Sequence, residues 1–325
     1  MARPTIRDVA TCADVSTATV SYVLNGTGSV SEPTASRVRA CVNQLGYRAN
    51  SVAVAHRTGR TKTIGLAVPD LTNGFFPEFA QGVHRAAADH GFAVVLLDAD
   101  NSIEAQAEGI NMLADRVPEG LILCLLKEDV FTDSKFPFPI VVFDHEIEGV
   151  DCIGADLHKG GRLQAEAVVE HGHRRIGLIC GPEWSGPAAV RRKGLLENLP
   201  DSVDVVWEHS LDWTADLPET AVADMLRHDV SCVVTGNDMQ ALGALQTFRS
   251  AGRSVPDDVS IIGFDDIDFA ALASPSLSTV RLPTRELGAT AFGMLVHRIE
   301  SPFMPVQQKR LDVQMMVRDS LRRIV

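Results

Sequence analysis

The stretch TIRDVATCADVSTATVSYVLNG, residues 5–26, decides how the N-terminus folds. Thr5 can cap a helix, an aspartate follows three positions later, and apolar residues recur with helical spacing up to position 13. Ser16 can cap a second helix, which Asn25 and Gly26 would end. Two short helices joined by about three residues predict a helix-turn-helix unit.

The second helix of such a unit enters the major groove of DNA with its N-terminal residues toward the base edges. The candidates for base contacts are therefore Thr17, Ala18, Ser21 and Tyr22. We expect DNA-phosphate contacts or helix caps at Thr5, Ser16, Thr19 and Asn25. Taken alone, each hydroxyl is explained equally well as a cap or as a group facing solvent.

A third helix is predicted over residues 32–45, with Ser31 as its cap, Pro33 in its first turn and Gly46 at its end. Residues 47–59 then lead to the rest of the chain and can form a short helix capped by Asn50. An isolated helix of about nine residues is only marginally stable in water, so this helix would need contact with DNA or with a partner to become ordered. The predicted organisation is an all-α DNA-binding domain at residues 1–49, a hinge at 50–61 and a body at 62–325.

Positive charge is concentrated at the N-terminus. Residues 1–63 contain eight Lys and Arg against three acidic residues, although the whole chain has a formal net charge of -12. The remaining residues hold 22 basic and 39 acidic side chains, which would repel a polyanion. This asymmetry is typical of a DNA-binding head on a body that stays off DNA, although a solvated basic face would carry the same charge.

From residue 62 onward, short β-rich runs alternate with helical stretches, which is typical of doubly wound parallel sheets. One set of strands is predicted near residues 64–68, 93–97, 121–124, 140–143 and 152–155, and a second near 176–180, 203–206, 232–234, 259–264 and 279–280. Helices are predicted near 76–90, 103–116, 160–171, 189–198, 219–227, 238–251 and 285–300. Two similar sheets imply a two-lobed α/β body with a cleft between the lobes.

Ligands of open α/β sheets bind at the carboxyl ends of the strands, so residues just after strands are the candidate ligand contacts. Carboxylates and amides there suit a polyhydroxylated ligand, because each accepts or donates several hydrogen bonds while an aromatic ring covers the C–H side of a sugar. Taken singly, an aspartate after a strand is more often a helix cap. The candidates for a small-molecule effector site are Asn73, Phe75, Phe76, Asp98, Asp144, Arg191, Trp213, Asn237 and Asp265.

The head closely resembles that of the lac repressor family, in the spaced elements TIRDVA, ADVSTATVSYVLNG, VSEPT and LGYRAN. The resemblance implies a homodimer that binds a near-palindromic operator, with paired hinge helices in the minor groove. It assigns DNA contacts to Asn50, Ala53 and His56 of the hinge. His56 stands where the family usually has a leucine that wedges into a base step, and from this we expect weaker or mildly pH-sensitive DNA bending.

The body resembles the periplasmic-binding-protein-like core of the same family, in IGLAVPDLTNGFF, EHGHRRIGLICGP, VVTGNDMQALGA and SIIGFDDID. The resemblance implies that a sugar, a nucleoside or a related metabolite binds in the cleft, with pocket roles for Asp144, Arg191, Trp213, Asn237 and Asp265. It also implies dimerisation through helices 76–90 and 103–116. Leu282 stands where relatives often have glutamine, so a smaller or less polar pocket is expected.

Other functional classes lack sequence support. The chain has no dinucleotide-binding or P-loop glycine motif, no H-E-x-x-H and no G-x-S-x-G, and His173 and the Asp265–Asp266 pair are its only tempting catalytic groups. We expect neither an enzyme nor a cofactor. A sugar-binding or sugar-processing α/β protein without a transcriptional role is the alternative.

The six cysteines are scattered without a C-x-x-C pair. We therefore expect buried thiols, with neither a metal site nor a disulfide. The sequence contains no signal peptide or apolar run of membrane-spanning length, so a cytoplasmic protein with no membrane association is expected.

Overall fold

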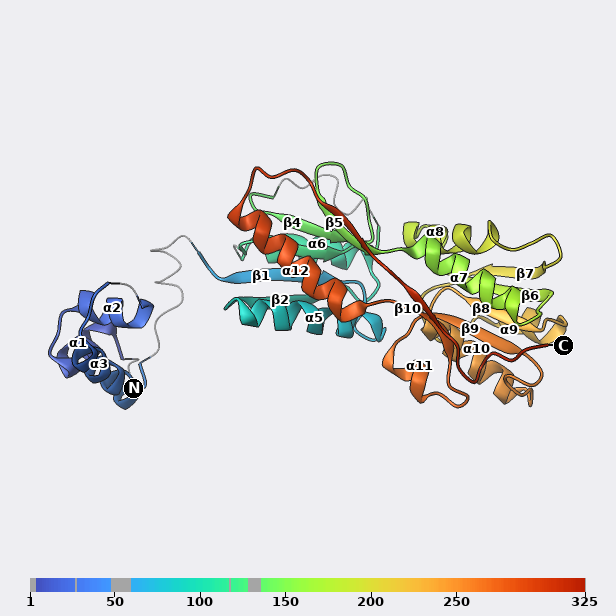
Figure 1. The fold of residues 1–325 in the computed structure, drawn as a ribbon, viewed down its shortest axis with the longest axis horizontal. Coiled ribbons are helices and arrows are strands. Elements are labelled where there is room, and N and C mark those ends of the chain that lie inside the picture. The colour runs from blue at the N-terminus through green and yellow to red at the C-terminus, as the bar shows by residue number, and fades with distance from the viewer. Residues whose placement is uncertain (1–3, 27, 48–59, 117, 128–135, 325) are drawn as a thin grey trace. The chain divides into compact units, whose positions relative to one another are not determined.

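The computed structural model describes residues 4–26, 28–47, 60–116, 118–127 and 136–324. Its contacts divide the chain into two compact units, residues 1–61 and 62–325, which we call the head and the body (Figure 1). Among the described residues, no helix combines the length and the hydropathy needed to span a bilayer. Nor do three or more His, Cys, Asp or Glu side chains of the described residues lie close enough together to hold a metal ion.

The head is the predicted three-helix unit, with α1 (Ile6–Ala13), α2 (Thr17–Asn25) and α3 (Glu32–Leu45). The Thr5 side chain accepts a hydrogen bond from the amide of Asp8, whose carboxylate accepts one from the amide of Thr5 at 2.7 Å. Asp14 ends α1 in a left-handed conformation with φ 49°, which aspartate tolerates better than most residues. Ser31 is the N-cap residue of α3, as predicted, but its side chain makes no capping hydrogen bond.

The core of the head is built from small side chains. The fully buried members are Val9, Ala10, Ala13, Val20, Val38 and Cys41, and larger side chains such as Leu45 are partly exposed at its edge. Cys41 forms a disulfide with Cys12 of α1, which corrects our expectation of free thiols at these two positions. The pairing was missed because only the packing of α1 on α3, 29 residues apart in the chain, brings the two cysteines together.

The described part of the body forms two six-stranded sheets, one in each lobe. The sheet of the first lobe has the order β11-β5-β4-β3-β1-β2, with β1 (Thr63–Val68), β2 (Ala93–Asp98), β3 (Leu121–Cys124), β4 (Ile140–Phe143), β5 (Asp151–Ala155) and β11 (Gln308–Leu311). The sheet of the second lobe has the order β12-β10-β9-β8-β6-β7, with β6 (Arg175–Cys180), β7 (Asp204–Ser210), β8 (Cys232–Thr235), β9 (Ser260–Asp265), β10 (Ser278–Arg281) and β12 (Gln314–Met316). Among the described strands, every pair is parallel except β10 with β12.

Helices flank both sheets. The first lobe carries α5 (Phe75–Asp89), α6 (Ile103–Ala114) and α12 (Thr284–Glu300), and the second carries α7 (Leu157–Glu170), α8 (Gly186–Leu196), α9 (Glu219–Arg227), α10 (Asp238–Ser250) and α11 (Asp268–Leu272). The predicted two-lobed doubly wound α/β body is therefore confirmed. The sequence missed β11, β12 and α11, because each is short and the first two have no alternating apolar pattern.

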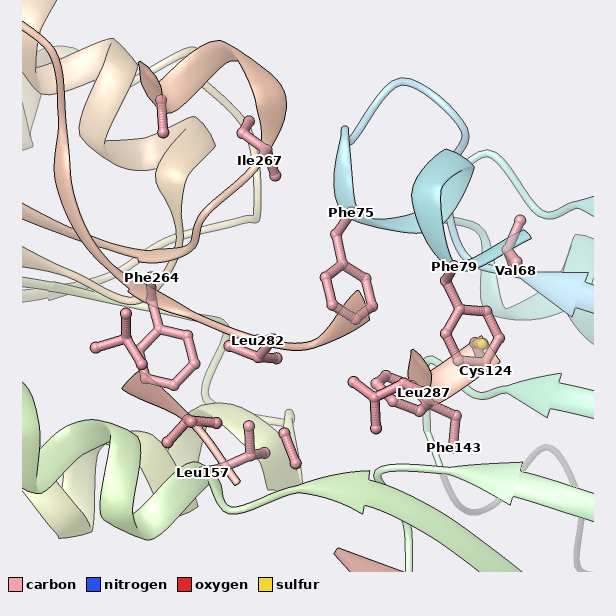
Figure 2. Packing of buried hydrophobic residues seen from close by; sticks show 14 of the residues in the cluster. Val68, Phe75, Phe79, Cys124, Phe143, Leu157, Phe264, Ile267, Leu282 and Leu287 are labelled. Atoms are coloured by element: carbon pink, nitrogen blue, oxygen red, sulfur yellow. The ribbon is translucent and has the colours of Figure 1, made fainter. Parts of the chain in front are cut away.

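The chain passes between the lobes three times, after β5, after β10 and after β11 (Figure 1). Side chains beside these crossings form a continuous apolar core that reaches from one lobe into the other. Figure 2 shows Leu282, on the second crossing, between Phe264 of the second lobe and Phe75 of the first. Phe79 and Phe143 continue this core in the first lobe, with ring centroids 4.9 Å apart. The two lobes are therefore joined both by three chain crossings and by this shared core.

Candidate DNA-contacting surface and effector cleft

The start of α2 presents the predicted DNA-contacting side chains to solvent. Thr17 and Ala18 are exposed, and the Tyr22 side chain is 49% exposed one turn later. Ser16 acts as the helix cap, because its hydroxyl accepts a hydrogen bond from the Thr19 amide at 3.1 Å. The cap orders the first turn of α2, which carries the exposed Thr17 and Ala18.

The ring of Tyr22 is held by the turn that follows α2. Gly28 adopts φ +83°, and a Cβ at this position would lie 3.1 Å from Cγ of Tyr22. A side chain there would therefore be strained and would push the ring aside. Ser21 is partly buried beside Tyr22. The Thr5 hydroxyl donates to the Asp8 carboxylate at 2.8 Å, so Thr5 serves the start of α1 as a cap.

The hinge candidates Asn50, Ala53 and His56 lie outside the described residues. The side chain of Asn25 also lies outside them, although its backbone ends α2 as predicted.

A cavity lies between the two lobes of the body, at the carboxyl ends of the strands. It encloses about 660 Å³, including space open to solvent. The first lobe contributes Pro69, Asn73, Phe75, Phe76, Asn101, Cys124, Leu125, Leu126, Phe143, Asp144 and His145; the second contributes Trp184, Ser185, Pro187, Arg191, Trp213, Asn237 and Asp265. Eight of the nine candidate effector contacts are therefore brought together.

Asp98 is the exception, because it does not line the cavity. Its carboxylate accepts from the amides of Leu71 at 3.3 Å and Asp100 at 3.2 Å, which makes it a loop-capping group. The physical reason is the position of β2 at the edge of the first sheet, one strand farther from the cavity than β1.

Arg191 is the central cation of the cavity. Its Nη1 donates to the carbonyl of Gly236 at 2.6 Å and lies 3.2 Å from Oδ1 of Asp265, while the guanidinium stacks 4.1 Å from the ring centroid of Phe264. Gly161 of α7 allows this placement, because a Cβ there would lie 2.1 Å from the Arg191 carbonyl oxygen of α8. Nε of Arg191 is buried without a hydrogen-bond partner.

Two carboxyl groups of the cavity hold protons unusually strongly. Burial raises the pKa of Asp144 to about 7 and that of Asp265 to about 6, and in both cases the positive charge of Arg191 opposes the rise. Oδ1 of Asp144 accepts from the amide of Ala155 at 3.1 Å. At neutral pH Asp144 can therefore either donate or accept a hydrogen bond toward a ligand hydroxyl.

The wall contributed by β3 is apolar, and the sequence did not predict it. Leu125 and Leu126 follow β3 and are buried. Gln106 of α6 fixes this segment, because it donates to the carbonyl of Cys124 and accepts from the amide of Leu126. His145 lies within hydrogen-bond distance of the Leu125 carbonyl, at 3.0 Å. Polar residues after strands mark only the polar part of a cavity, so they carry no signal for an apolar wall.

A second buried glutamine organises the opposite wall. Nε2 of Gln240 donates to the carbonyls of Cys180, Leu211 and Asp212, and so fixes the segment that carries Trp213. Asn237 caps α10 by accepting from the Gln240 amide at 2.9 Å, so it has a structural role as well as its place in the cavity. Trp184, which the sequence did not single out, lines the cavity and remains 42% exposed.

Asp266 and His173, two of the three candidate catalytic residues, have structural partners outside the cavity, whereas Asp265 lines it. Asp266 pairs with Arg281 and with Arg318, the latter with Nη2 2.5 Å from its carboxylate. His173 is fully buried, its Nδ1 lies 2.9 Å from the Ser231 hydroxyl, and burial lowers its pKa to about 4. Neither Asp266 nor His173 is among the residues that line the cavity.

Two family models match separate parts of the chain, and known proteins match nearly its whole length. Residues 5–50 match the model of bacterial regulatory proteins of the lacI family, and residues 165–321 match that of a periplasmic binding protein-like domain. The ribose operon repressor of Escherichia coli (strain K12) is 32% identical, across 97% of this chain and 99% of that protein.

Solved structures agree in fold. The lac repressor dimer bound to operator and the anti-inducer ONPF matches with a TM-score of 0.87 and 26% identity, covering 99% of this chain and 100% of that one. A LacI family transcriptional regulator from Enterococcus faecium with bound ribose matches with a TM-score of 0.72 and 30% identity, covering 81% of this chain and 100% of that one. Since the identity to the ribose operon repressor extends through both the head and the body, the chain belongs to the lacI family of bacterial regulatory proteins.

Proposed function

We propose that this protein is a transcriptional repressor that binds a specific operator through its head and changes its operator affinity when a small molecule binds between the lobes of its body. The observation that carries the proposal is the cavity itself, where Arg191, Asp144 and Asp265 meet aromatic rings contributed by both lobes. A ligand that touches both lobes couples its binding to the angle between them.

The effector is a small neutral molecule rich in hydroxyl groups, with a sugar favoured over a nucleoside. Asp144, Asp265, Asn73 and Asn237 offer acceptors and donors for hydroxyl pairs, while Trp184 and the phenylalanines can cover an apolar face. The related Enterococcus faecium regulator binds ribose, which has this chemistry. A strongly anionic effector is disfavoured, because Arg191 is already paired with Asp265.

The DNA contacts follow from the helix-turn-helix geometry. Thr17, Ala18, Ser21 and Tyr22 contact bases, and Ser16, Thr19 and Asn25 lie beside the phosphates. The hinge residues Asn50, Ala53 and His56 complete the contact. A bacterial protein that binds operator DNA works in the cytoplasm.

The protein acts as a homodimer, because one short recognition helix makes too few contacts for a specific affinity of about 10⁻⁸ M. Exposed apolar side chains on the body offer the contact surface. Val95 and Leu96 are exposed on the edge strand β2, Met112 on α6, and Phe269 and Leu272 on α11. The predicted use of α5 is less direct, because α5 buries much of its surface against α12 of the same chain.

The experiment that tests this function uses the full chain to select duplexes from a random-sequence DNA library. A single enriched, near-palindromic sequence is expected, and enrichment should be lost in Thr17→Ala combined with Tyr22→Ala. Selection of no sequence, or equal selection by the variant, would reject the proposal. A parallel thermal-shift series with D-ribose, D-xylulose, cellobiose and adenosine identifies the effector class, because a ligand at 100 times its Kd adds about 2.7 kcal/mol of stability.

A further inference from the structure

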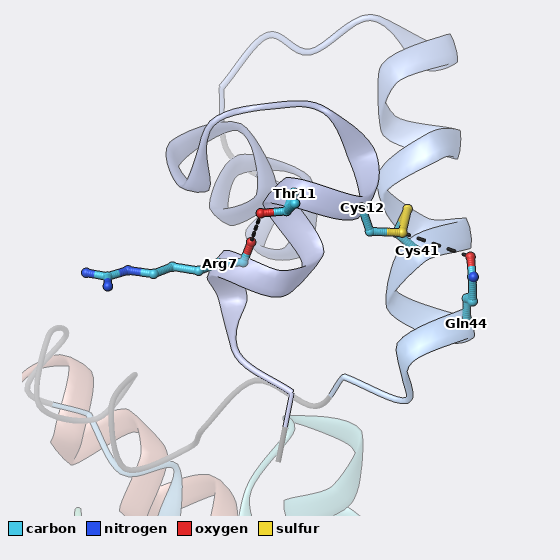
Figure 3. Close-up of a disulfide and its surroundings, with 5 residues drawn as sticks. All are labelled: Arg7, Thr11, Cys12, Cys41 and Gln44. Carbon is cyan, nitrogen blue, oxygen red and sulfur yellow. Dashed lines mark hydrogen bonds between the residues drawn. A yellow bond between two sulfur atoms is a disulfide. The ribbon is translucent and has the colours of Figure 1, made fainter. Parts of the chain in front are cut away.

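The disulfide between Cys12 and Cys41 lies in the head, within the unit that is proposed to bind DNA. Cys12 is on α1 and Cys41 is on α3, with their Cα atoms 5.9 Å apart, within the range that a disulfide spans without moving the backbone (Figure 3). The pair can therefore open and close in place, since the contact of α1 with α3 already holds the two residues together.

The two sulfurs differ in their access to solvent. Cys12 is on the exposed face of α1, whereas Cys41 is 6% exposed and belongs to the core of the head. A small reagent in solution can therefore reach Cys12 first, with Cys41 poised behind it as the resolving thiol. This arrangement of an accessible thiol beside a resolving thiol is typical of a redox-active pair.

The other four cysteines are different. Cys124, Cys152, Cys180 and Cys232 are buried free thiols, and burial raises the pKa of each, to about 11 for Cys152 and about 12 for Cys180. A buried thiol with a raised pKa forms little thiolate and reacts slowly. Oxidation is therefore directed to the head and away from the body.

The position of the disulfide in the chain links the stability of the head to the recognition helix α2. The segment between Cys12 and Cys41 contains the whole recognition helix α2. A cross-link over this separation stabilises mainly by restricting the unfolded chain. The effect is large for a small domain whose buried core, among the described residues of the head, contains no aromatic side chain.

We propose that Cys12 and Cys41 form a reversible thiol-modification site that responds to low-molecular-weight disulfides and controls how much of the head is folded and able to bind operator. Disulfides that form in a compartment rich in small thiols are commonly transient and redox-sensing rather than structural. The proposal rests on the proposed operator binding for its consequence, but its chemistry can be tested separately.

The exchange proceeds in two balanced steps. The Cys12 thiolate attacks one sulfur of the small disulfide, which forms a mixed disulfide and releases one small thiolate. The Cys41 thiolate then attacks the Cys12 sulfur, closes the bridge and releases the second small thiolate. The protein loses two electrons and two protons, and the small disulfide gains both as two thiols.

The first test counts thiols in the full-length protein. After incubation with oxidised glutathione, alkylation followed by peptide mass spectrometry should find Cys12 and Cys41 bridged and the other four cysteines unbridged. Excess reduced glutathione should reopen the bridge. Free thiols at Cys12 and Cys41 after the oxidant, or a bridge that resists the reductant, would overturn the proposal.

The second test follows the head by hydrogen exchange of its amides, and the body by emission of Trp184, Trp207 and Trp213, which all lie in the body. Oxidation should raise the Tm of the head by about 10 °C or more and leave the tryptophan transition unchanged. Cys12→Ser, a change at an exposed side chain, should melt like the reduced protein in either redox state. An unchanged Tm in the wild type would overturn the proposal without reference to any variant.

The third test uses a duplex that the oxidised full chain selects from a random library. Midway between the two Tm values, the reduced protein should bind about fivefold more weakly or worse, because only its folded fraction binds. At a temperature well below both Tm values, the two forms should bind alike. Equal binding at every temperature would overturn the switch, whereas failure of both forms to bind any duplex would reject the proposed function and leave the thiol and Tm results standing.

Discussion

Arg191 and Asp265 form a buried ion pair in the wall of the cavity, with Nη1 3.2 Å from Oδ1 and side chains that are 12% and 5% exposed. The arginine comes from α8 and the aspartate from the end of β9, so the pair ties a helix of the second lobe to its sheet. It also sets the charge that an effector meets in the cleft.

Removing one member of this pair should destabilise the body. Arg191→Met leaves Asp265 buried beside no cation, and such a loss costs about 3 kcal/mol. The double variant Arg191→Met with Asp265→Asn should recover part of that cost, because neither charge is then left alone. Urea unfolding, followed by tryptophan emission, measures the unfolding free energies of the wild type, the two single variants and the double variant. If the losses of the two single variants add up to that of the double variant, the two groups are not coupled.

The contribution of Asp144 to the stability of the body should fall as the pH rises from about 4 to about 7. Asp144 has a folded-state pKa of about 7, above its ordinary value of 3.8, so the native state keeps a proton that the unfolded state loses. The stabilisation is complete below pH 3.8 and is lost as the pH passes through 7, at up to about 1.4 kcal/mol per pH unit.

The matched variant is Asp144→Asn, which keeps an oxygen to accept from Ala155 and tolerates the left-handed φ of 55° at this position. The difference in unfolding free energy between wild type and variant should shift by several kcal/mol over this range, because only the wild type titrates at position 144. A pH-independent difference would contradict the protonation of Asp144.

Trp184→Ala should weaken effector binding about tenfold and leave stability nearly unchanged. The ring lines the cavity but remains 42% exposed, so its removal costs ligand contact more than core packing. Titration calorimetry with the sugar that gives the largest thermal shift measures the loss. Phe303→Ala is the control, because Phe303 is a fully exposed aromatic residue outside the cavity lining.

Tyr22→Ala should reduce specific operator binding by at least about tenfold, which is the scale of one lost base contact. Binding to an unrelated duplex should change little, since phosphate contacts remain. The tryptophan transition of the body should also be unchanged, because Tyr22 lies in the head. Equal losses on both duplexes would indicate a misfolded head rather than a lost base contact.

The sequence predicted most of the cavity because of one geometric rule. Parallel strands bring their carboxyl ends to one edge of a sheet, so the chain order of strands and polar residues was enough to group Asp144, Asn237 and Asp265. The same rule misplaced Asp98, because the order of strands in the sheet, which puts β2 at the edge, is not written in local sequence.

Features that depend on packing between distant segments could not be predicted from local sequence. The Cys12–Cys41 bridge requires the contact between α1 and α3, and the apolar wall at Leu125 and Leu126 depends on the hydrogen bonds of Gln106. Leu282 shows the same limit. It was expected to make the pocket less polar, but it lies in the core that joins the lobes rather than in the lining of the cavity.

The most direct test of effector control is the operator affinity of the full chain with and without its effector. The duplex is the one selected from the random library, and the effector is the sugar or nucleoside with the largest thermal shift. Saturating effector should change the operator Kd by about fivefold or more, a coupling of about 1–3 kcal/mol, and DNA should change the effector Kd by the same factor. An operator Kd that is identical with and without bound effector would contradict the coupling of the cleft to the head.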